Sequence, residues 1–323
     1  RRDLVTITDV APTALALLGV PEPVSMSGHV LRVRPGGTEL NRIRAFDDML
    51  VSRRSTDQPM TLVFILVQSA LYAAGVLMLM RGRLSTRRGS ALLFAVLTCA
   101  AWPLATFWIR GSLALSSLGT RTALATWLIA AVVAAVAWRF RRHPLDPLLV
   151  VCALTVATIV ADLSTGAHLQ YGSFFGYAPN KGTRFTGIGN AAFALLAASA
   201  VVVCTALVSR ATNRARGWWG AAAVAVVVVV ADGASWMGSD VGGILSLVPV
   251  LGLLMWTLSG RTVRWRTVGY AALGAVVVLA VAVGLDALRA PDQRTHLSRF
   301  FLNLGDWSMV TDVIREKSTM NIR

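Results

Sequence analysis

Acidic residues are scarce in this chain. Only 16 of its 323 residues are Asp or Glu, against 31 Lys and Arg, and charged residues make up 15% of the total. Soluble domains carry about 25% charged residues, so the composition argues against an ordinary soluble protein. The basic excess would suit nucleic acid if the arginines lay together on one surface. They stand mostly between apolar stretches, and we therefore expect no nucleic-acid partner.

Cysteine is also sparse. Cys99, Cys152 and Cys204 all lie inside apolar stretches, and no Cys-x-x-Cys or Cys/His spacing typical of zinc occurs. A buried cysteine behaves as a small hydrophobic side chain. Neither a disulfide framework nor a zinc site is therefore expected.

Long apolar stretches dominate the chain instead, and its mean hydropathy is +0.62. Eight of them approach the roughly 20 residues that a helix needs to cross a bilayer. Single strands would leave backbone groups unpaired in lipid. The stretches cover roughly residues 60–80, 89–109, 118–138, 146–163, 187–208, 218–234, 241–259 and 267–286. The sequence therefore predicts an all-α polytopic membrane protein with about eight transmembrane helices and membrane lipid as a partner.

The arginines predict the orientation of these helices. Alternate connectors carry thirteen of them: Arg81, Arg83, Arg87, Arg88, Arg139, Arg141, Arg142, Arg210, Arg214, Arg216, Arg261, Arg264 and Arg266. The other connectors carry four basic residues: Arg110, Arg121, Lys181 and Arg184. Cytoplasmic loops are enriched in Lys and Arg, so both ends of the chain are expected to be extracytoplasmic, in a multi-pass protein of the plasma (inner) membrane. Because the chain begins without Met or a signal-peptide pattern, we expect it to be a fragment of a longer protein.

The first 31 residues differ from the rest. "LVTI" (Leu4–Ile7) predicts a short strand, Thr8 and Asp9 a helix cap with Pro12 in the first turn, and Gly19 the helix end. This order resembles the C-terminal end of alkaline-phosphatase and sulfatase superfamily hydrolases, with the phrase D-x-x-P-T-x-x-x-x-x-G followed by G-x-x-L. The matching positions are Asp9, Pro12, Thr13, Gly19, Gly28 and Leu31.

That resemblance implies a small α/β remnant at the N-terminus. The family's metal ligands and nucleophile lie upstream of the matched phrase, so a divalent metal would belong to an ectodomain outside this chain. His29 is expected to be a polar surface residue, because metal sites need several converging ligands. We expect four segments: residues 1–31 as the remnant, 32–59 as a linker with a juxtamembrane helix, 60–286 as the membrane domain, and 287–323 as an extracytoplasmic segment. The last carries an amphipathic helical face at Leu297, Phe300, Phe301 and Leu304.

Two connectors on the predicted outer side are polar and rich in glycine. One covers 164–190 and contains "YGSFFGYAPNKGTRFTGIGN" (Tyr171–Asn190), and the other is "ADGASWMGSDVGG" (Ala231–Gly243). Glycine lets backbone approach a ligand or a helix closely, and helix starts attract anions. We expect the two glycine-rich helix starts to face each other. The candidates for anion or substrate binding are Lys181, Arg184, Gly187, Gly189, Asn190, Gly242 and Gly243.

Three carboxylates lie near the same edge of the predicted membrane: Asp162, Asp232 and Asp240. Ionisable groups at membrane depth are costly and therefore indicate function. They are candidates for holding a cation beside a bound anion, which would suit a lipid-linked phosphate or phosphosugar. The alternative is structural: the carboxylates cap helices, the aromatics lie at the lipid interface and the glycines let helices pack.

The whole arrangement resembles actinobacterial envelope proteins in which an alkaline-phosphatase-like ectodomain precedes a multi-span domain with R-F-x-G-I-G-N and G-x-D-V-G-G phrases. The matching residues here are Arg184–Asn190 and Gly238–Gly243. Our hypothesis is the transmembrane part of a phosphatase-like fusion that binds or processes an anionic lipid-linked envelope substrate at its outer face. Three alternatives stay open. The chain belongs to an enzyme, to a transporter or flippase of an anionic precursor, or to a structural anchor without a site.

Overall fold

The computed structural model describes residues 7–21, 23, 26, 30–31, 40–83, 87–111, 120–177, 187–289, 311 and 315. These residues are mainly helical, and none of them forms a β-strand beyond an isolated bridge between Tyr171 and Tyr177. The chain divides into two compact units. One contains Arg1–Ile43 and Leu279–Arg323, and the other contains Arg44–Val278.

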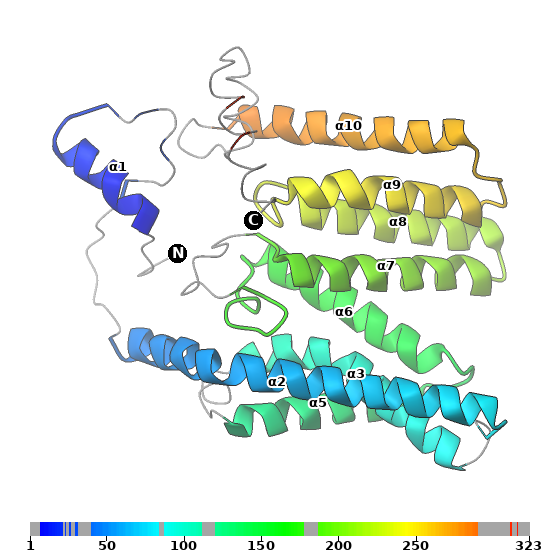
Figure 1. Cartoon of the computed structure of the whole chain (residues 1–323). Helices are drawn as coiled ribbons and strands as arrows, with labels where there is room; N and C mark the ends of the chain where they lie inside the picture. The colour runs from blue at the N-terminus through cyan, green and yellow to red at the C-terminus, as the bar shows by residue number, and fades with distance from the viewer. Residues whose placement is uncertain are drawn as a thin grey trace. The chain divides into compact units, whose positions relative to one another are not determined.

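Eight helices in the described residues are long and apolar enough to cross a membrane (Figure 1). They are α2 (Leu40–Met80), α3 (Arg87–Trp108), α5 (Thr120–Arg139), α6 (Asp146–Ser164), α7 (Asn190–Arg210), α8 (Arg214–Gly233), α9 (Val241–Leu258) and α10 (Trp265–Ala287). A short 3₁₀ helix, η1 (Ile109–Gly111), follows α3. The spans within the eight helices begin and end within a few residues of the predicted ones. The prediction of an all-α polytopic membrane protein is therefore confirmed.

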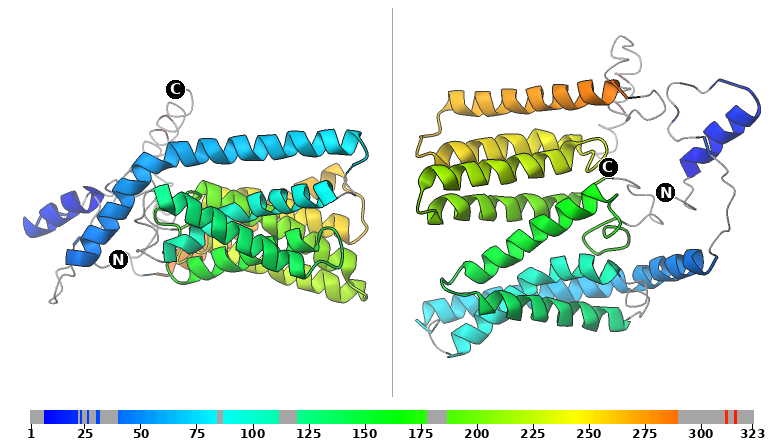
Figure 2. Two further views of the ribbon diagram at one scale, coloured as in Figure 1. Left: turned by 90° about the horizontal axis from the view of Figure 1, so that it is seen from below. Right: turned by 180° about the vertical axis from the view of Figure 1, so that it is seen from behind.

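The first span is part of a longer helix than the sequence suggested. Residues 32–59 were expected to form a linker with a juxtamembrane helix that ends before the first span at residue 60. In the structure, α2 runs without interruption from Leu40 to Met80 with Pro59 inside it. Proline removes one backbone hydrogen bond and kinks a helix without having to end it. The bend of α2 can be followed in Figure 2.

Two apolar clusters fill the unit Arg44–Val278. One joins α6, α7, α8 and α9 and includes Leu196, Ala225 and Leu247. The other joins α3 and α5 with parts of α2 and α6, around Trp102 and Ala134. Alanines at these helix contacts let the backbones approach, which is how helices pack in lipid. Helix α6 contributes to both clusters and thereby links them.

In the other unit, α1 (Ile7–Leu17) ends as predicted. Gly19 has a φ of +69°, the Val20 amide donates to the Leu15 carbonyl, and the Gly19 amide donates to the Ala16 carbonyl. This is the Schellman pattern, in which glycine takes the left-handed position. Thr13 joins the helix to the following turn, since its hydroxyl accepts a hydrogen bond of 2.9 Å from the Leu31 amide.

The predicted start of α1 is wrong. The helix begins at Ile7, so Asp9 lies within it instead of capping it, and Pro12 lies beyond the first turn. Ile7 also falls in the helix, whereas the rest of the predicted strand, residues 4–6, lies outside the described residues. Gly28, His29 and the predicted amphipathic face at 297–304 lie outside them as well.

Candidate functional site

The two glycine-rich connectors meet at one end of the helices in the unit Arg44–Val278 (Figure 1). The Ile188 amide donates to the Gly238 carbonyl, with 2.9 Å between nitrogen and oxygen. Gly187 has a φ of +80°, and a Cβ added there would lie 2.0 Å from the same oxygen. Only glycine allows the two backbones to approach so closely in this conformation. The expectation that the starts of α7 and α9 face each other is therefore confirmed.

A buried glutamine holds the first connector to the start of α7. Gln170 is 0% exposed, and its Oε1 accepts a hydrogen bond of 3.0 Å from the Gly189 amide. Its Nε2 donates to the Gly187 carbonyl at 3.4 Å and lies 3.5 Å from Asp162 Oδ2. Gln170 was not among the residues predicted from the sequence. The available signal was an amide side chain in a connector whose buried backbone groups need partners.

Asp162 organises the turn that follows α6. Its Oδ1 accepts a 2.7 Å hydrogen bond from the Leu169 amide, and its main-chain carbonyl accepts one of 2.6 Å from the Ala167 amide. Ala167 takes a left-handed φ of +57°. The side chain of Asp162 is buried. These contacts give the carboxylate a structural role in shaping the first connector.

The second connector closes the end of α8 onto the start of α9. The Asp240 amide donates to the Asp232 carbonyl at 3.0 Å, and the Gly238 amide donates to the Ala231 carbonyl at 2.8 Å. The side chain of Asp232 is fully buried. A Cβ added to Gly243 would lie 2.1 Å from Asp232 Oδ2. Close packing against this carboxylate therefore requires glycine at position 243.

The structure divides the predicted anion-binding residues into three groups. Those that are buried in backbone packing are Gly187, Gly189 and Gly243. Those that are exposed at the helix starts are Asn190, the first residue of α7, and Gly242, in the first turn of α9. Lys181 and Arg184 lie outside the described residues.

Neither helix start is closed by the side chain of its own N-cap residue. Gly189 is the N-cap of α7 and has no side chain, and Asp240 is the N-cap of α9 without a side-chain capping bond. Helices α7 and α9 contact each other. The first amides of a helix need partners, and they attract negatively charged groups. Two such starts therefore lie side by side at this end of the unit.

The three candidate cation ligands are all buried: Asp162, Asp232 and Asp240. Among the described residues, however, no three or more His, Cys, Asp or Glu side chains are grouped so that they could hold a metal ion. A metal site needs several ligands that converge on one point. The cation site therefore stays a prediction, without support from the geometry of the described residues.

Two arginines from α2 and η1 also hold the first connector by hydrogen bonds to its carbonyl groups. Neither was predicted from the sequence to belong to the site. Arg110 donates from Nε to the Gly172 carbonyl at 2.6 Å, and Arg53 donates from Nη1 to the Tyr177 carbonyl at 3.3 Å. Arg53 also forms a 2.9 Å ion pair with Asp57. Burial and the positive charge of Arg53 lower the pKa of Arg110 to about 10. Arg110 therefore stays charged at neutral pH.

The aromatic residues of the first connector pack onto the helices. The rings of Phe174 and Phe175 lie 5.6 Å and 5.9 Å from the Trp102 ring, measured between centroids. Ser173 Oγ lies 3.1 Å from Thr106 Oγ1 in α3. Phe174 and Phe175 therefore pack against Trp102 of α3. Phe185 lies outside the described residues.

Comparison with known proteins adds no family to this geometry. No family model, no curated protein and no solved structure matches the chain.

Proposed function

We propose that this integral membrane protein binds an anionic, lipid-linked envelope substrate where its two glycine-rich connectors meet. The observation that carries the proposal is the hydrogen bond between Ile188 and Gly238, which brings two helix starts together from distant parts of the chain. Asn190 and Gly242 are exposed at those starts. Helix starts favour phosphate because their amides donate hydrogen bonds and their dipoles are positive.

Two carboxylates at this end are engaged with the protein's own groups, which supports an anion over a cation as the ligand. Asp162 is hydrogen-bonded to the Leu169 amide, and Asp57 is paired with Arg53. Asp47 and Asp48, near the start of α2, are exposed. The segment that joins the two parts of the first connector supplies Lys181 and Arg184. A phosphate bound at the helix starts would therefore meet positive charge from the same connector.

The arginine distribution supports placing this site on the outer face of the plasma membrane. The thirteen arginines of the alternate connectors belong to the opposite ends of the helices. Cytoplasmic loops carry the excess of basic residues. In this orientation the bound phosphate is extracytoplasmic, and the lipid tail lies between or beside the helices.

The resemblance of residues 9–31 to the alkaline-phosphatase superfamily supports assigning substrate binding and hydrolysis to different parts of the protein. The hydrogen bond between Thr13 and Leu31 joins two of the matched positions. The family's nucleophile and metal ligands lie upstream of the matched phrase, so hydrolysis would belong to residues outside this chain. We therefore assign substrate binding to the membrane unit and assign it no catalytic step.

The proposal is tested by lipid binding to the chain reconstituted in phosphatidylcholine nanodiscs. The probes are a polyprenyl phosphate and the polyprenol of the same length. Wild type should prefer the phosphate, and Arg184→Ala should weaken phosphate binding about tenfold, because a hydrogen bond to a charged group is lost. Asp240→Ala should also weaken phosphate binding, because it replaces the N-cap residue of α9. Arg121→Ala is the matched control, because Arg121 lies at the start of α5, on the same predicted side, and is exposed.

Equal binding of the phosphate and the alcohol by wild type would contradict the proposal. Wild-type affinity in both Arg184→Ala and Asp240→Ala would remove the assigned site. If the chain, reconstituted in sealed liposomes without any ectodomain, moved the polyprenyl phosphate across the bilayer, the transporter alternative would replace the binding role. Full tolerance of both connectors to substitution would instead favour a structural anchor.

A further inference from the structure

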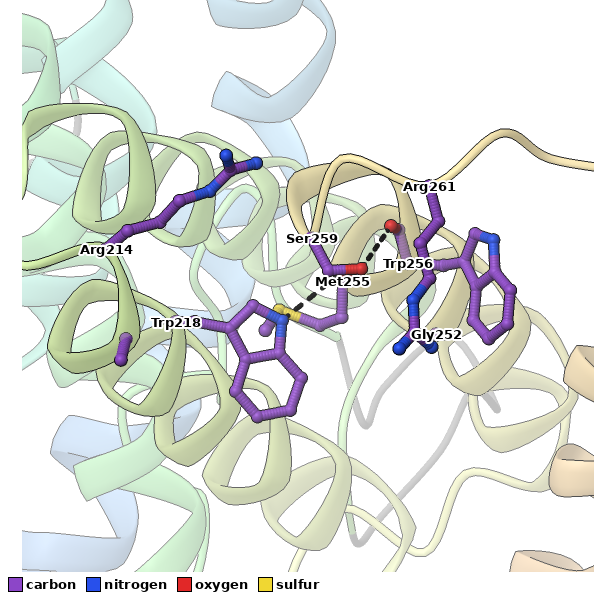
Figure 3. A pocket seen from close by; sticks show the side chains of 8 residues that line it. Arg214, Trp218, Gly252, Met255, Trp256, Ser259 and Arg261 are labelled. Carbon is purple, nitrogen blue, oxygen red and sulfur yellow. Dashed lines mark hydrogen bonds between the residues drawn. The ribbon is translucent and has the colours of Figure 1, made fainter.

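A groove of about 610 Å³ lies at the other end of α8 and α9, away from the glycine-rich connectors (Figure 3). Its residues come from the first turns of α8, from the last turns of α9 and from the chain that follows α9. They are Arg214, Trp218, Gly252, Met255, Trp256 and Arg261, with Ala215 and Ser259. All of them belong to the unit Arg44–Val278.

The groove is apolar along its length and basic at its rim. The Trp218 indole forms one wall and is fixed by a 3.3 Å hydrogen bond from Nε1 to the Met255 carbonyl. A Cβ added to Gly252 would meet nothing within 4 Å, so the groove is open there. Gly252 lies seven residues before Ser259, which is about 10 Å along a helix. The open part therefore reaches from the membrane surface into the depth of the acyl chains.

Two arginines with fixed backbone or ring contacts stand at the rim. Arg214 donates from Nη2 to the Leu258 carbonyl at 3.0 Å, and Arg261 lies over the Trp256 ring at 4.9 Å. Both side chains are exposed. Figure 3 shows the two guanidinium groups on different sides of the groove and pointing away from each other. Each guanidinium carries five N–H groups, so both keep donors for an anionic headgroup.

The charge around the groove is strongly one-sided. Between residues 58 and 285 the chain has four acidic residues, and three of them lie at the opposite helix ends, at positions 162, 232 and 240. The fourth, Asp146, forms an ion pair with Arg210. Arginine therefore outnumbers carboxylate at this end, and an anionic group would meet an uncompensated positive field.

From this groove we infer a specific site for one phospholipid with an anionic headgroup. The anionic headgroup lies at the rim that Arg214 and Arg261 flank, and one acyl chain lies against Trp218 and Met255 as far as Gly252. The occupant is a lipid because the apolar part continues the membrane surface, and basic pockets between membrane helices are suited to anionic headgroups. The site is independent of the proposed outer site and uses none of its residues.

The test is native mass spectrometry of the detergent-purified chain, titrated with phosphatidylglycerol or phosphatidylcholine of identical acyl chains. Wild type should bind phosphatidylglycerol more tightly. The variant Arg214→Gln/Arg261→Gln should lose about 30-fold in phosphatidylglycerol affinity, because each basic residue near an anionic headgroup contributes a factor of about five. Arg264→Gln/Arg266→Gln is the charge-matched control and should keep most of the preference; Arg266 also lies over a tryptophan, Trp265.

A second variant separates the acyl chain from the headgroup. Gly252→Leu fills the open part of the groove, and leucine is a better helix former than glycine, so the fold should be kept. It should weaken the binding of both lipids and leave their affinity ratio unchanged. Gly274→Leu in α10 is its control, since position 274 also has nothing within 4 Å of an added Cβ.

Three results would overturn the inference. One is equal affinity of wild type for the two lipids. Another is a loss in the Arg264/Arg266 control as large as in the groove variant, which would reduce the effect to general surface charge. The third is full displacement of phosphatidylglycerol by soluble glycerol phosphate at equal concentration, because a site without an acyl-chain groove would behave in that way.

Discussion

At the scale of single residues, the glycines of the two connectors are explained mainly by contact distances. Gly187 and Gly243 each lie where an added Cβ would come within about 2 Å of an oxygen, the Gly238 carbonyl and Asp232 Oδ2 respectively. A larger residue would therefore have to displace backbone at position 187 and the buried Asp232 carboxylate at position 243. The glycines therefore build the site, and the exposed residues beside them are the ones that can contact a ligand.

We expect Gly187→Ala to destabilise the protein by about 1–3 kcal/mol, because alanine would have to take a left-handed φ and would clash with a carbonyl. Gly274→Ala, in the open interior of α10, should change stability by less than about 1 kcal/mol, in the stabilising direction. The measurement is a thermal melt with a thiol-reactive dye, since the cysteines are free and buried: Cys99, Cys152 and Cys204. A Gly187→Ala melt that matches wild type would show that the connectors do not approach as described.

At the scale of elements, the described residues 165–177 of the first connector are held by hydrogen bonds to α2, η1 and the start of α7. Gln170 accepts the Tyr177 amide at its main-chain carbonyl, and its side chain reaches the start of α7. Arg53 and Arg110 bind the same loop from α2 and η1. The end of α6 and the start of α7 therefore depend on one amide side chain and on two arginines.

Replacing Gln170 with leucine should cost about 2 kcal/mol, because the Gly189 amide and the Gly187 carbonyl would be buried without that partner. Hydrogen exchange should speed up at residues 165–177 and at the start of α7. Gln68→Leu in α2 is the matched control, since its amide bonds the Tyr72 hydroxyl at an exposed position. Unchanged exchange in Gln170→Leu would mean that the connector is held by the arginines and the aromatic packing instead.

At the scale of the whole molecule, the predicted topology assigns a different chemistry to each end of the membrane helices. One end carries the glycine-rich connectors, and the other carries thirteen arginines and the groove between α8 and α9. If basic loops are cytoplasmic, the outer face would bind a lipid-linked phosphate and the inner face would bind an anionic phospholipid.

This orientation is tested by labelling intact cells with a membrane-impermeant maleimide. The variant Asn180→Cys should be labelled in intact cells, whereas the variant His143→Cys should be labelled only after lysis. The native cysteines are buried and should react with neither treatment. Labelling of residue 180 only after lysis would invert the topology and would place the proposed substrate site in the cytoplasm.

The architecture of the membrane domain could be predicted from the hydrophobic runs alone. Hydrophobic runs of about 20 residues allow only one secondary structure in lipid, so eight spans could be located within a few residues. The sequence also identified both connectors and the facing helix starts. It missed the start of α1 and the continuity of α2 through Pro59, because local capping and proline signals are weaker than the surrounding helix.

Only the tertiary structure decided what each polar residue in the connectors does. Gly187 and Gly243 are held by packing, whereas Asn190 and Gly242 stay exposed, although all four looked alike as candidates. The roles of Gln170, Arg53 and Arg110 could not be predicted from the sequence, because their partners are backbone carbonyls and amides up to 124 positions away. The groove at Trp218 and Gly252 could not be predicted from the sequence either, because its residues come from two different helices. Apolar periodicity is a local property of a chain, whereas hydrogen-bond partners and open space are set by which helices come to lie side by side.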